Sequence, residues 1–131
     1  MMFVIDANVL FSALDDMDSN AGRLLLKAIS GDVKLYSTEH VMVEMLDILV
    51  RKLDYSEDDV DEAVKALPVE WVDSEVYAYE LKAAKGILKD EYDASLFACA
   101  ALLGCDVLTG DKAVLAAMFR DVKVLKLKDA L

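Results

Sequence analysis

The sequence has few of the residues that build metal knuckles or disulfide frameworks. It contains one histidine, His40, and two cysteines, Cys99 and Cys105, which stand six positions apart. Cys99 falls inside an apolar helical pattern, so the pair forms neither a disulfide framework nor a zinc knuckle. No apolar run reaches the roughly 18–20 residues that a membrane-spanning helix requires.

The N-terminus also lacks the features of a secretory leader. Residues 1–5 carry no basic side chain and are followed at once by Asp6. We therefore expect no signal peptide, no membrane association and a cytoplasmic location. The 131 residues, of which 56% are hydrophobic, suffice for one packed core. This length predicts a single domain over residues 1–131.

Positive charge is scarce, with 14 basic against 25 acidic residues and a formal net charge of −11. Such a balance works against long-range attraction of nucleic acids. The excess is local, because residues 54–80 hold ten acids and a single base, Lys65, for a net charge of −9. The remaining residues carry only −2, which does not forbid a substrate that bears phosphate groups.

Short apolar runs alternate with helical patterns along the whole chain. The runs predict strands at residues 3–5, 33–36, 69–72, 106–108 and 122–125. The patterns predict helices over 8–14, 21–29, from 37 or 38 to about 53, from 56 to about 67, from 73 or 74 to about 88, 90–103 and 111–118. This alternation predicts an α/β fold, with about five short parallel strands and helices on both faces. Ligands of such folds bind at the carboxyl ends of the strands.

Two acids are placed at the ends of predicted strands. Asp6 directly follows the first strand, and Asp111 comes shortly after the strand at residues 106–108. Aspartate is also common where a strand gives way to a turn or a helix cap, so neither position identifies a site by itself.

Two further acids are placed on the apolar faces of predicted helices. Glu44 falls on the stripe that contains Val41 and Ile48, and Asp93 heads the apolar face of its helix. A carboxylate on a core-facing side costs free energy unless it is paired or binds a cation. In the alternative interpretation, Glu44 reaches water at the edge of its stripe and Asp93 serves the helix start, with Asp90 as the N-cap.

Convergence of the four acids would have a large electrostatic cost. Two like charges about 4 Å apart repel by about 4 kcal/mol at an effective dielectric constant of about 20. Raised pKa values or a bound cation relieve this repulsion. An all-oxygen set of ligands suits Mg²⁺ or Mn²⁺.

Four short motifs follow one another along the chain. They are FVIDANVL at residues 3–10, the strand end and helix of residues 37–49, DEYDASLFA at residues 90–98, and LTGDK at residues 108–112. In order and spacing they resemble the four motifs of PIN domains, over essentially the whole chain. We interpret the sequence as similar to the VapC-like members of that family.

The resemblance implies a three-layer α/β sandwich and a metal-dependent ribonuclease that hydrolyses RNA phosphodiester bonds with Mg²⁺ or Mn²⁺. The residues that match the acidic catalytic and metal-binding positions are Asp6, Glu44, Asp93 and Asp111, with Asp90 as a fifth metal ligand. Asn8 and Thr109 match the polar residues that support them. The resemblance also implies the toxin of a toxin–antitoxin pair, a homodimer that binds an antitoxin. It identifies no RNA-binding residues.

The sequence leaves other functions open. A PIN fold can serve as a binding module with weak or lost catalysis, and the acidic segment 54–80 departs from many nucleases of the family. A haloacid-dehalogenase-type phosphatase also has an aspartate such as Asp6 at its first strand end, but it needs a second aspartate where Asn8 stands. A receiver domain needs an acidic pair after the first strand and a mid-chain aspartate at a strand end, and neither is present. His40 receives no role.

Overall fold

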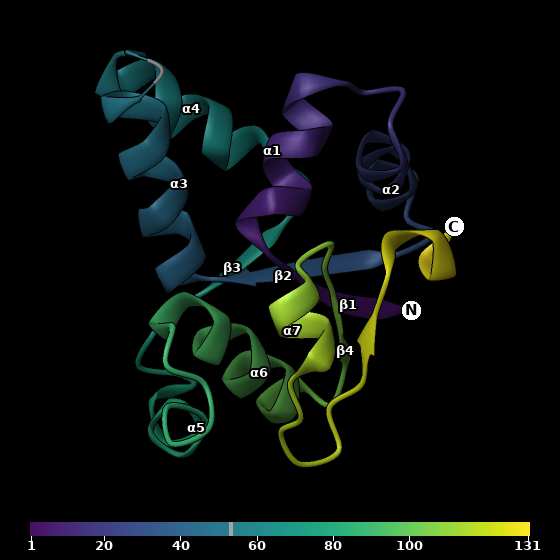
Figure 1. The fold of residues 1–131 in the computed structure, drawn as a ribbon. Coiled ribbons are helices and arrows are strands. Elements are labelled where there is room, and N and C mark those ends of the chain that lie inside the picture. The colour runs from purple at the N-terminus through teal and green to yellow at the C-terminus, as the bar shows by residue number, and fades with distance from the viewer. Residues whose placement is uncertain (53) are drawn as a thin grey trace.

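A sheet of five parallel strands forms the centre of the molecule (Figure 1). The computed structural model describes residues 1–52 and 54–131. Its strands are β1 (Met2–Ile5), β2 (Lys34–Thr38), β3 (Glu70–Val72), β4 (Asp106–Leu108) and β5 (Val124–Leu125). They lie in the order β3-β2-β1-β4-β5, and each neighbouring pair is parallel. The predicted five-stranded parallel sheet is confirmed.

Helices cover both faces of this sheet. They are α1 (Ala7–Asp15), α2 (Asn20–Ile29), α3 (Glu39–Arg51), α4 (Glu57–Ala66), α5 (Ala78–Ala84), α6 (Glu91–Leu103) and α7 (Lys112–Ala116), followed by a 3₁₀ turn, η1 (Leu127–Ala130). Figure 1 shows α1 and α2 above the sheet and α5 and α6 below it. The strand order explains why helices lie on both faces. The chain crosses from β1 toward one edge of the sheet and later toward the other, and right-handed crossovers in opposite directions place their helices on opposite faces. The result is a three-layer α/β sandwich.

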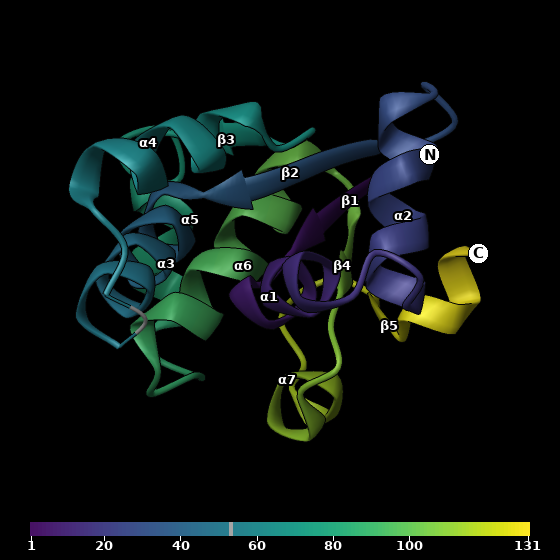
Figure 2. The same cartoon turned by 90° about the horizontal axis from the view of Figure 1, so that it is seen from above.

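The core lies between the sheet and the two helical layers. Residues 3–5 of β1 are buried, as expected for a central strand that is covered on both faces. Below them, α6 is buried over residues 94–100 and contacts β1, β2 and β4. Seen from above, α3 and α4 lie at one end of the molecule, whereas α2 and both chain termini lie at the other (Figure 2).

One predicted helix is much shorter than its sequence pattern suggests. The pattern predicts a helix from residue 73 or 74 to about 88, but α5 covers only Ala78–Ala84. Ser74 does not cap it, because its backbone N–H and its hydroxyl group both donate to the carboxylate of Glu39 on α3. Tyr77, the residue before α5, is fully buried. Contacts with another part of the fold therefore override the local pattern.

Other boundaries differ by a few residues. α3 ends at Arg51, and residue 53, the predicted end, lies outside the described residues. The last strand begins at residue 124 instead of 122, and α7 ends at Ala116 instead of residue 118. None of these differences involves a predicted site residue.

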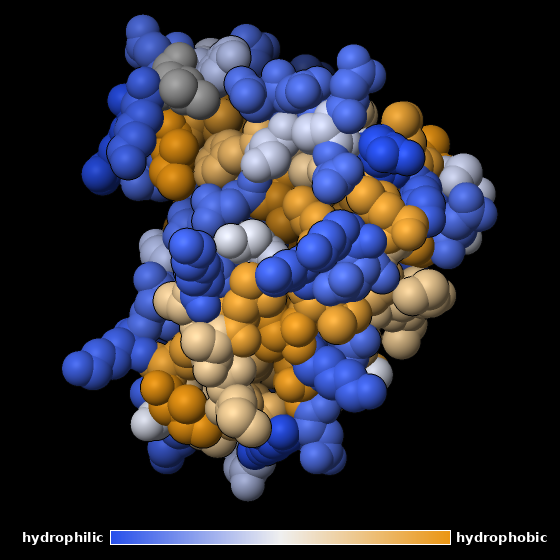
Figure 3. Space-filling view, turned by 45° about the vertical axis from the view of Figure 1, so that its right-hand side comes forward, coloured by the Kyte–Doolittle hydropathy of each residue, from blue (hydrophilic) through white to orange (hydrophobic). Residues whose placement is uncertain are grey.

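The surface carries hydrophobic as well as charged side chains. In Figure 3, hydrophobic atoms gather in the middle of one face, with hydrophilic atoms around them. Tyr79 and Met118 are the most exposed of the large hydrophobic side chains, at 80% and 81%. Within the described residues, no helix is both long and apolar enough to cross a membrane.

Candidate functional site

The candidate site lies where the order of the strands changes direction. From β1 the chain moves to β2 and β3 on one side, and it then returns to β4 and β5 on the other side. β1 and β4 are neighbours, and Ile5 is paired with Leu108 at their carboxyl ends. A switch of this kind opens a crevice between the loops that leave the two strands. Asp6 and Thr109 are the first residues after these strands.

Asp6 is buried and held by two hydrogen bonds. Its side chain is the N-cap of α1, because Oδ1 accepts the backbone N–H of Val9 at 3.0 Å. Its Oδ2 accepts the hydroxyl group of Thr109, which is fully buried. The Thr109 oxygen in turn accepts the backbone N–H of Asp111 at 3.0 Å. These bonds fix Asp6 between the ends of β1 and β4.

A cleft of about 210 Å³ opens above Asp6. It is lined by Asp6, Ala7, Asn8, Val41, Glu44, Ile48, Asp90, Tyr92, Asp93, Leu96 and Asp111. All five acids predicted from the sequence therefore reach one cleft, together with Asn8. Thr109 lies beneath it, against Asp6.

Three of these acids also cap helices. The alternative interpretation of the sequence, in which such acids serve as helix caps, therefore holds as well. Besides Asp6, Asp90 caps α6 by accepting the N–H groups of Tyr92 and Asp93 at 2.8 and 3.1 Å. Asp111 caps α7 by accepting the N–H of Ala113 at 2.8 Å. Each of these caps uses only the Oδ1 atom. Capping thus fixes each of the three carboxylates through one oxygen, and the second oxygen of Asp6 accepts the Thr109 hydroxyl group.

Burial and mutual repulsion raise the pKa values of three acids in the cleft, Asp93, Glu44 and Asp6. Burial is the main cause for Asp93, and the charges of the neighbouring acids add to it, which together raise its pKa to about 6. Burial also raises the pKa of Glu44, with further contributions from Asp90 and Asp6. The pKa of Asp6 is raised by burial, although its hydrogen bonds to Thr109 and Val9 oppose the shift. The acids are therefore close enough to affect one another.

This shift predicts a pH dependence of folding stability. Asp93 has a higher pKa in the folded protein than the ordinary aspartate value of 3.8, so its stabilising contribution is complete below pH 3.8 and is lost as the pH rises through about 6. We expect Asp93→Asn to reduce the difference in unfolding free energy between pH 5 and pH 7.5 by roughly 1 kcal/mol, a value that allows for solvent screening of this half-buried group. Urea denaturation in EDTA measures this difference.

The control for this prediction is Asp58→Asn, which removes an exposed acid from α4. It should leave the pH dependence close to that of the original protein. An equal change in both variants would mean that overall charge, and not the cleft, governs the effect.

Two larger grooves lie beside α3 and α4, but the acids that line them are all exposed, whereas the acidic cleft contains the buried Asp6. One, of about 580 Å³, is lined by Asp47 and Asp61, among others. These two acids are more than half exposed and form ion pairs with Arg51 and Lys65. The other, of about 840 Å³, is lined mainly by apolar residues of α1, α3 and α4. The small acidic cleft is therefore the candidate site.

The donors in the cleft suit a hard divalent cation. They are carboxylate oxygens, which Mg²⁺ and Mn²⁺ prefer, and no Lys or Arg is among the described residues that line the cleft. Across residues 1–52 and 54–131, however, no three His, Cys, Asp or Glu side chains stand in position to hold a metal ion. Cation binding at this site therefore requires side-chain rotation. The caps restrain Asp90 and Asp111 but use only Oδ1, so Oδ2 of each carboxylate lies outside the cap bonds.

Sequence reasoning missed one group of polar residues next to the cleft. The sequence assigns His40 no role, yet its ring contacts both Tyr77 and Glu91. One signal was available: His40 stands four residues before Glu44, so both lie on the same face of α3. The two partners, 37 and 51 residues away, carry no such signal.

Comparisons with known proteins agree with this geometry. The sequence has no match among curated proteins. Among solved structures, the fold resembles a chain of the DNA-bound VapBC complex of Salmonella typhimurium, with a TM-score of 0.73, 14% identity, and coverage of 97% of this chain and 98% of that chain. A chain of a toxin–antitoxin complex from Klebsiella pneumoniae gives a TM-score of 0.69 at 16% identity, with coverage of 95% and 97%.

A third similar structure is the DNA-bound VapBC2 of Rickettsia felis, with a TM-score of 0.66, 14% identity, and coverage of 96% of this chain and 98% of that chain. At these identities the likeness concerns the fold. The family model named PIN domain matches residues 3–123, a range that includes every acid of the cleft. The resemblance seen in the sequence is confirmed, and the chain belongs to the PIN domain family.

Proposed function

We propose that the protein is a metal-dependent endoribonuclease that hydrolyses RNA phosphodiester bonds. The observation that carries this proposal is the meeting of five acids, from four separate parts of the chain, in one cleft at the switch point of the sheet. PIN-domain nucleases generally use divalent metal ions. Family membership also favours this activity over the phosphatase and the receiver domain considered from the sequence.

In this proposal, Asp6, Glu44 and Asp93 hold Mg²⁺ or Mn²⁺, and Asp111 and Asp90 contribute from the rim of the cleft. Such an ion, when bound, lowers the pKa of water and stabilises negative charge on a phosphate group. The Thr109 hydroxyl keeps the buried Asp6 carboxylate oriented, as partners of metal ligands do. Asn8 is exposed at the cleft, where its amide group can donate to a carboxylate or to a water molecule.

We further propose that the protein is a VapC-like toxin of the cytoplasm, which forms a homodimer and pairs with an antitoxin. Similar folds occur in complexes described as VapBC or as toxin–antitoxin pairs. The exposed hydrophobic side chains would suit protein interfaces. The acidic residues 54–80 would suit a partner with a basic segment.

The direct test is RNA cleavage by the purified protein. We expect cleavage of single-stranded RNA with Mn²⁺ or Mg²⁺, products with 5′-phosphate and 3′-hydroxyl ends, and no cleavage in EDTA. Asp93→Asn, purified in the same way and with the same fold, should not cleave the RNA. It is therefore the control for a contaminating nuclease. Cleavage that persists in EDTA would contradict the proposal. Binding of a partner protein without any RNA cleavage would instead favour the alternative function, a PIN fold that serves as a binding module.

A further inference from the structure

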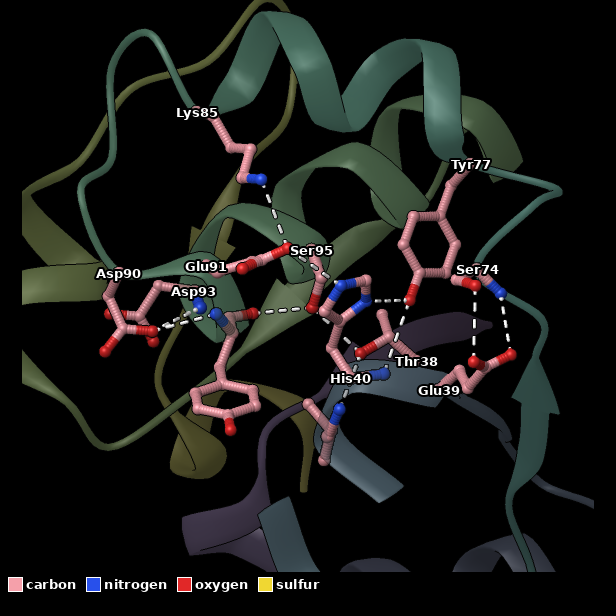
Figure 4. Close-up of polar contacts among 12 residues, drawn as sticks. Thr38, Glu39, His40, Ser74, Tyr77, Lys85, Asp90, Glu91, Asp93 and Ser95 are labelled. Atoms are coloured by element: carbon pink, nitrogen blue, oxygen red, sulfur yellow. Dashed lines mark hydrogen bonds and ion pairs between the residues drawn. The ribbon is translucent and has the colours of Figure 1, made fainter. Parts of the chain in front are cut away.

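A chain of hydrogen bonds connects α3, α6 and the segment before α5 beside the acidic cleft (Figure 4). The Nδ1 atom of His40 lies 2.5 Å from the hydroxyl oxygen of Tyr77, and its Nε2 atom lies 3.2 Å from Oε1 of Glu91. Lys85 contacts the same Glu91 oxygen at 3.2 Å. In Figure 4, His40 lies between Tyr77 and Glu91. The ring is therefore held on both sides.

The chemistry of the partners assigns the hydrogens in this chain. The Glu91 carboxylate only accepts, so Nε2 of His40 carries the hydrogen and donates it. In a neutral ring, Nδ1 then accepts the hydroxyl hydrogen of Tyr77. The Tyr77 oxygen in turn accepts the backbone N–H of His40 at 3.4 Å. Tyr77 is fully buried, which makes it a fixed support for the ring.

The two ends of this link belong to α3 and to the start of α6, which form two walls of the cleft. His40 is in the first turn of α3, one turn before Glu44 and on the same helical face. Glu91 is the first residue of α6, directly after Asp90 and two residues before Asp93. The side chains of Glu44, Asp90 and Asp93 line the cleft.

The walls of the cleft repel one another because both carry carboxylates. The negative charges of Asp90 and Asp6 act on Glu44, and that of Glu44 acts on Asp93. A divalent cation needs these oxygens at a narrow range of distances, about 2.0–2.1 Å for Mg²⁺. A contact that fixes the start of α6 against the start of α3 therefore limits how far the acids can separate.

We propose that His40 is a positioning residue of the acidic cleft: by linking Glu91 to α3, it sets the distance between the wall of Glu44 and the wall of Asp90 and Asp93. This inference rests on the proposed metal-dependent function. The Ser74–Glu39 contact is a useful contrast. It fixes the same helix start to the segment after β3, away from α6.

The test compares Mn²⁺ binding by His40→Ala with that of the original protein in isothermal calorimetry. We expect the dissociation constant to rise about tenfold, the lower end of the range for residues that orient metal ligands. His40→Gln should recover most of the affinity, because its amide N–H lies near the position of Nε2. Glu39→Ala, which breaks the Ser74 contact, should leave affinity within about twofold. Equal affinity in His40→Ala and the original protein would overturn the inference.

Hydrogen exchange at the N–H groups of Tyr92 and Asp93 gives a second readout that needs no metal. Asp90 caps both groups, so their protection reports on the start of α6. We expect faster exchange in His40→Ala and not in Glu39→Ala. If the original protein binds no Mn²⁺, the proposed function fails. If exchange at the N–H groups of Tyr92 and Asp93 is unchanged in His40→Ala, the hydrogen-bonded link does not position α6, and the inference fails independently of the proposed function.

Discussion

Replacement of Asp6 by asparagine is expected to lower Mn²⁺-dependent RNA cleavage by about 10²–10³-fold or more while the fold is retained. Asp6 is the most buried acid of the cleft and lies at the end of β1, where its carboxylate is held by Thr109 and Val9. Asparagine has the same size but no negative charge. Since burial raises the pKa of Asp6, its charge costs folding free energy, and the variant should melt at the same or a higher temperature.

The matched control for this variant is Asp121→Asn, which removes one exposed acid remote from the cleft. Its cleavage rate should stay within about twofold of the original protein. Rates from several RNA concentrations, together with melting curves, separate a loss of chemistry from a loss of structure. Cleavage at the original rate by folded Asp6→Asn would refute the assigned role of this carboxylate.

Replacement of Thr109 by valine should destabilise the protein strongly. The Thr109 hydroxyl donates to the buried Asp6 carboxylate and accepts the backbone N–H of Asp111. Valine has nearly the same shape but leaves both groups without this partner. Because one of them is a buried charge, we expect a loss of about 2–3 kcal/mol of unfolding free energy at pH 7 in urea denaturation.

Thr109→Ser tests whether the hydroxyl group or the packing is responsible. It keeps the donor and acceptor and removes only a methyl group, so it should retain most of the stability. In the double variant Asp6→Asn/Thr109→Val, the cost of the valine should shrink, because no buried charge remains to be satisfied. A valine variant as stable as the original protein would show that the contact with Asp6 contributes little.

Much of the site could be predicted from the sequence because its acids stand at the ends of apolar strands or on the apolar faces of helices. Asp6 and Asp111 follow apolar strands, and parallel strands bring their carboxyl ends to the same edge. Glu44 interrupts an apolar helical stripe, which indicates a cleft or a partner. These signals depend only on neighbouring residues, so a single sequence contains them.

The parts that could not be predicted depend on contacts between distant residues. The hydrogen bond between Thr109 and Asp6 joins residues 103 positions apart, and the family resemblance implies only that Thr109 supports the acids, without naming its partner. The short α5 results from Ser74 binding to Glu39, which no helical periodicity reveals. His40 was missed for the same reason, because its importance comes from where Tyr77 and Glu91 lie in space.

Calorimetric titration of Mn²⁺ into the metal-free protein tests the central claim most directly, namely that the five acids of the cleft form a cation site. We predict saturable binding in the micromolar to millimolar range that is lost in Asp6→Asn and retained in Asp121→Asn. Binding should also raise the melting temperature of the original protein, because a cation that binds only the folded state stabilises it. Heats no larger than those of dilution up to millimolar Mn²⁺, with no shift in melting temperature, would contradict the account.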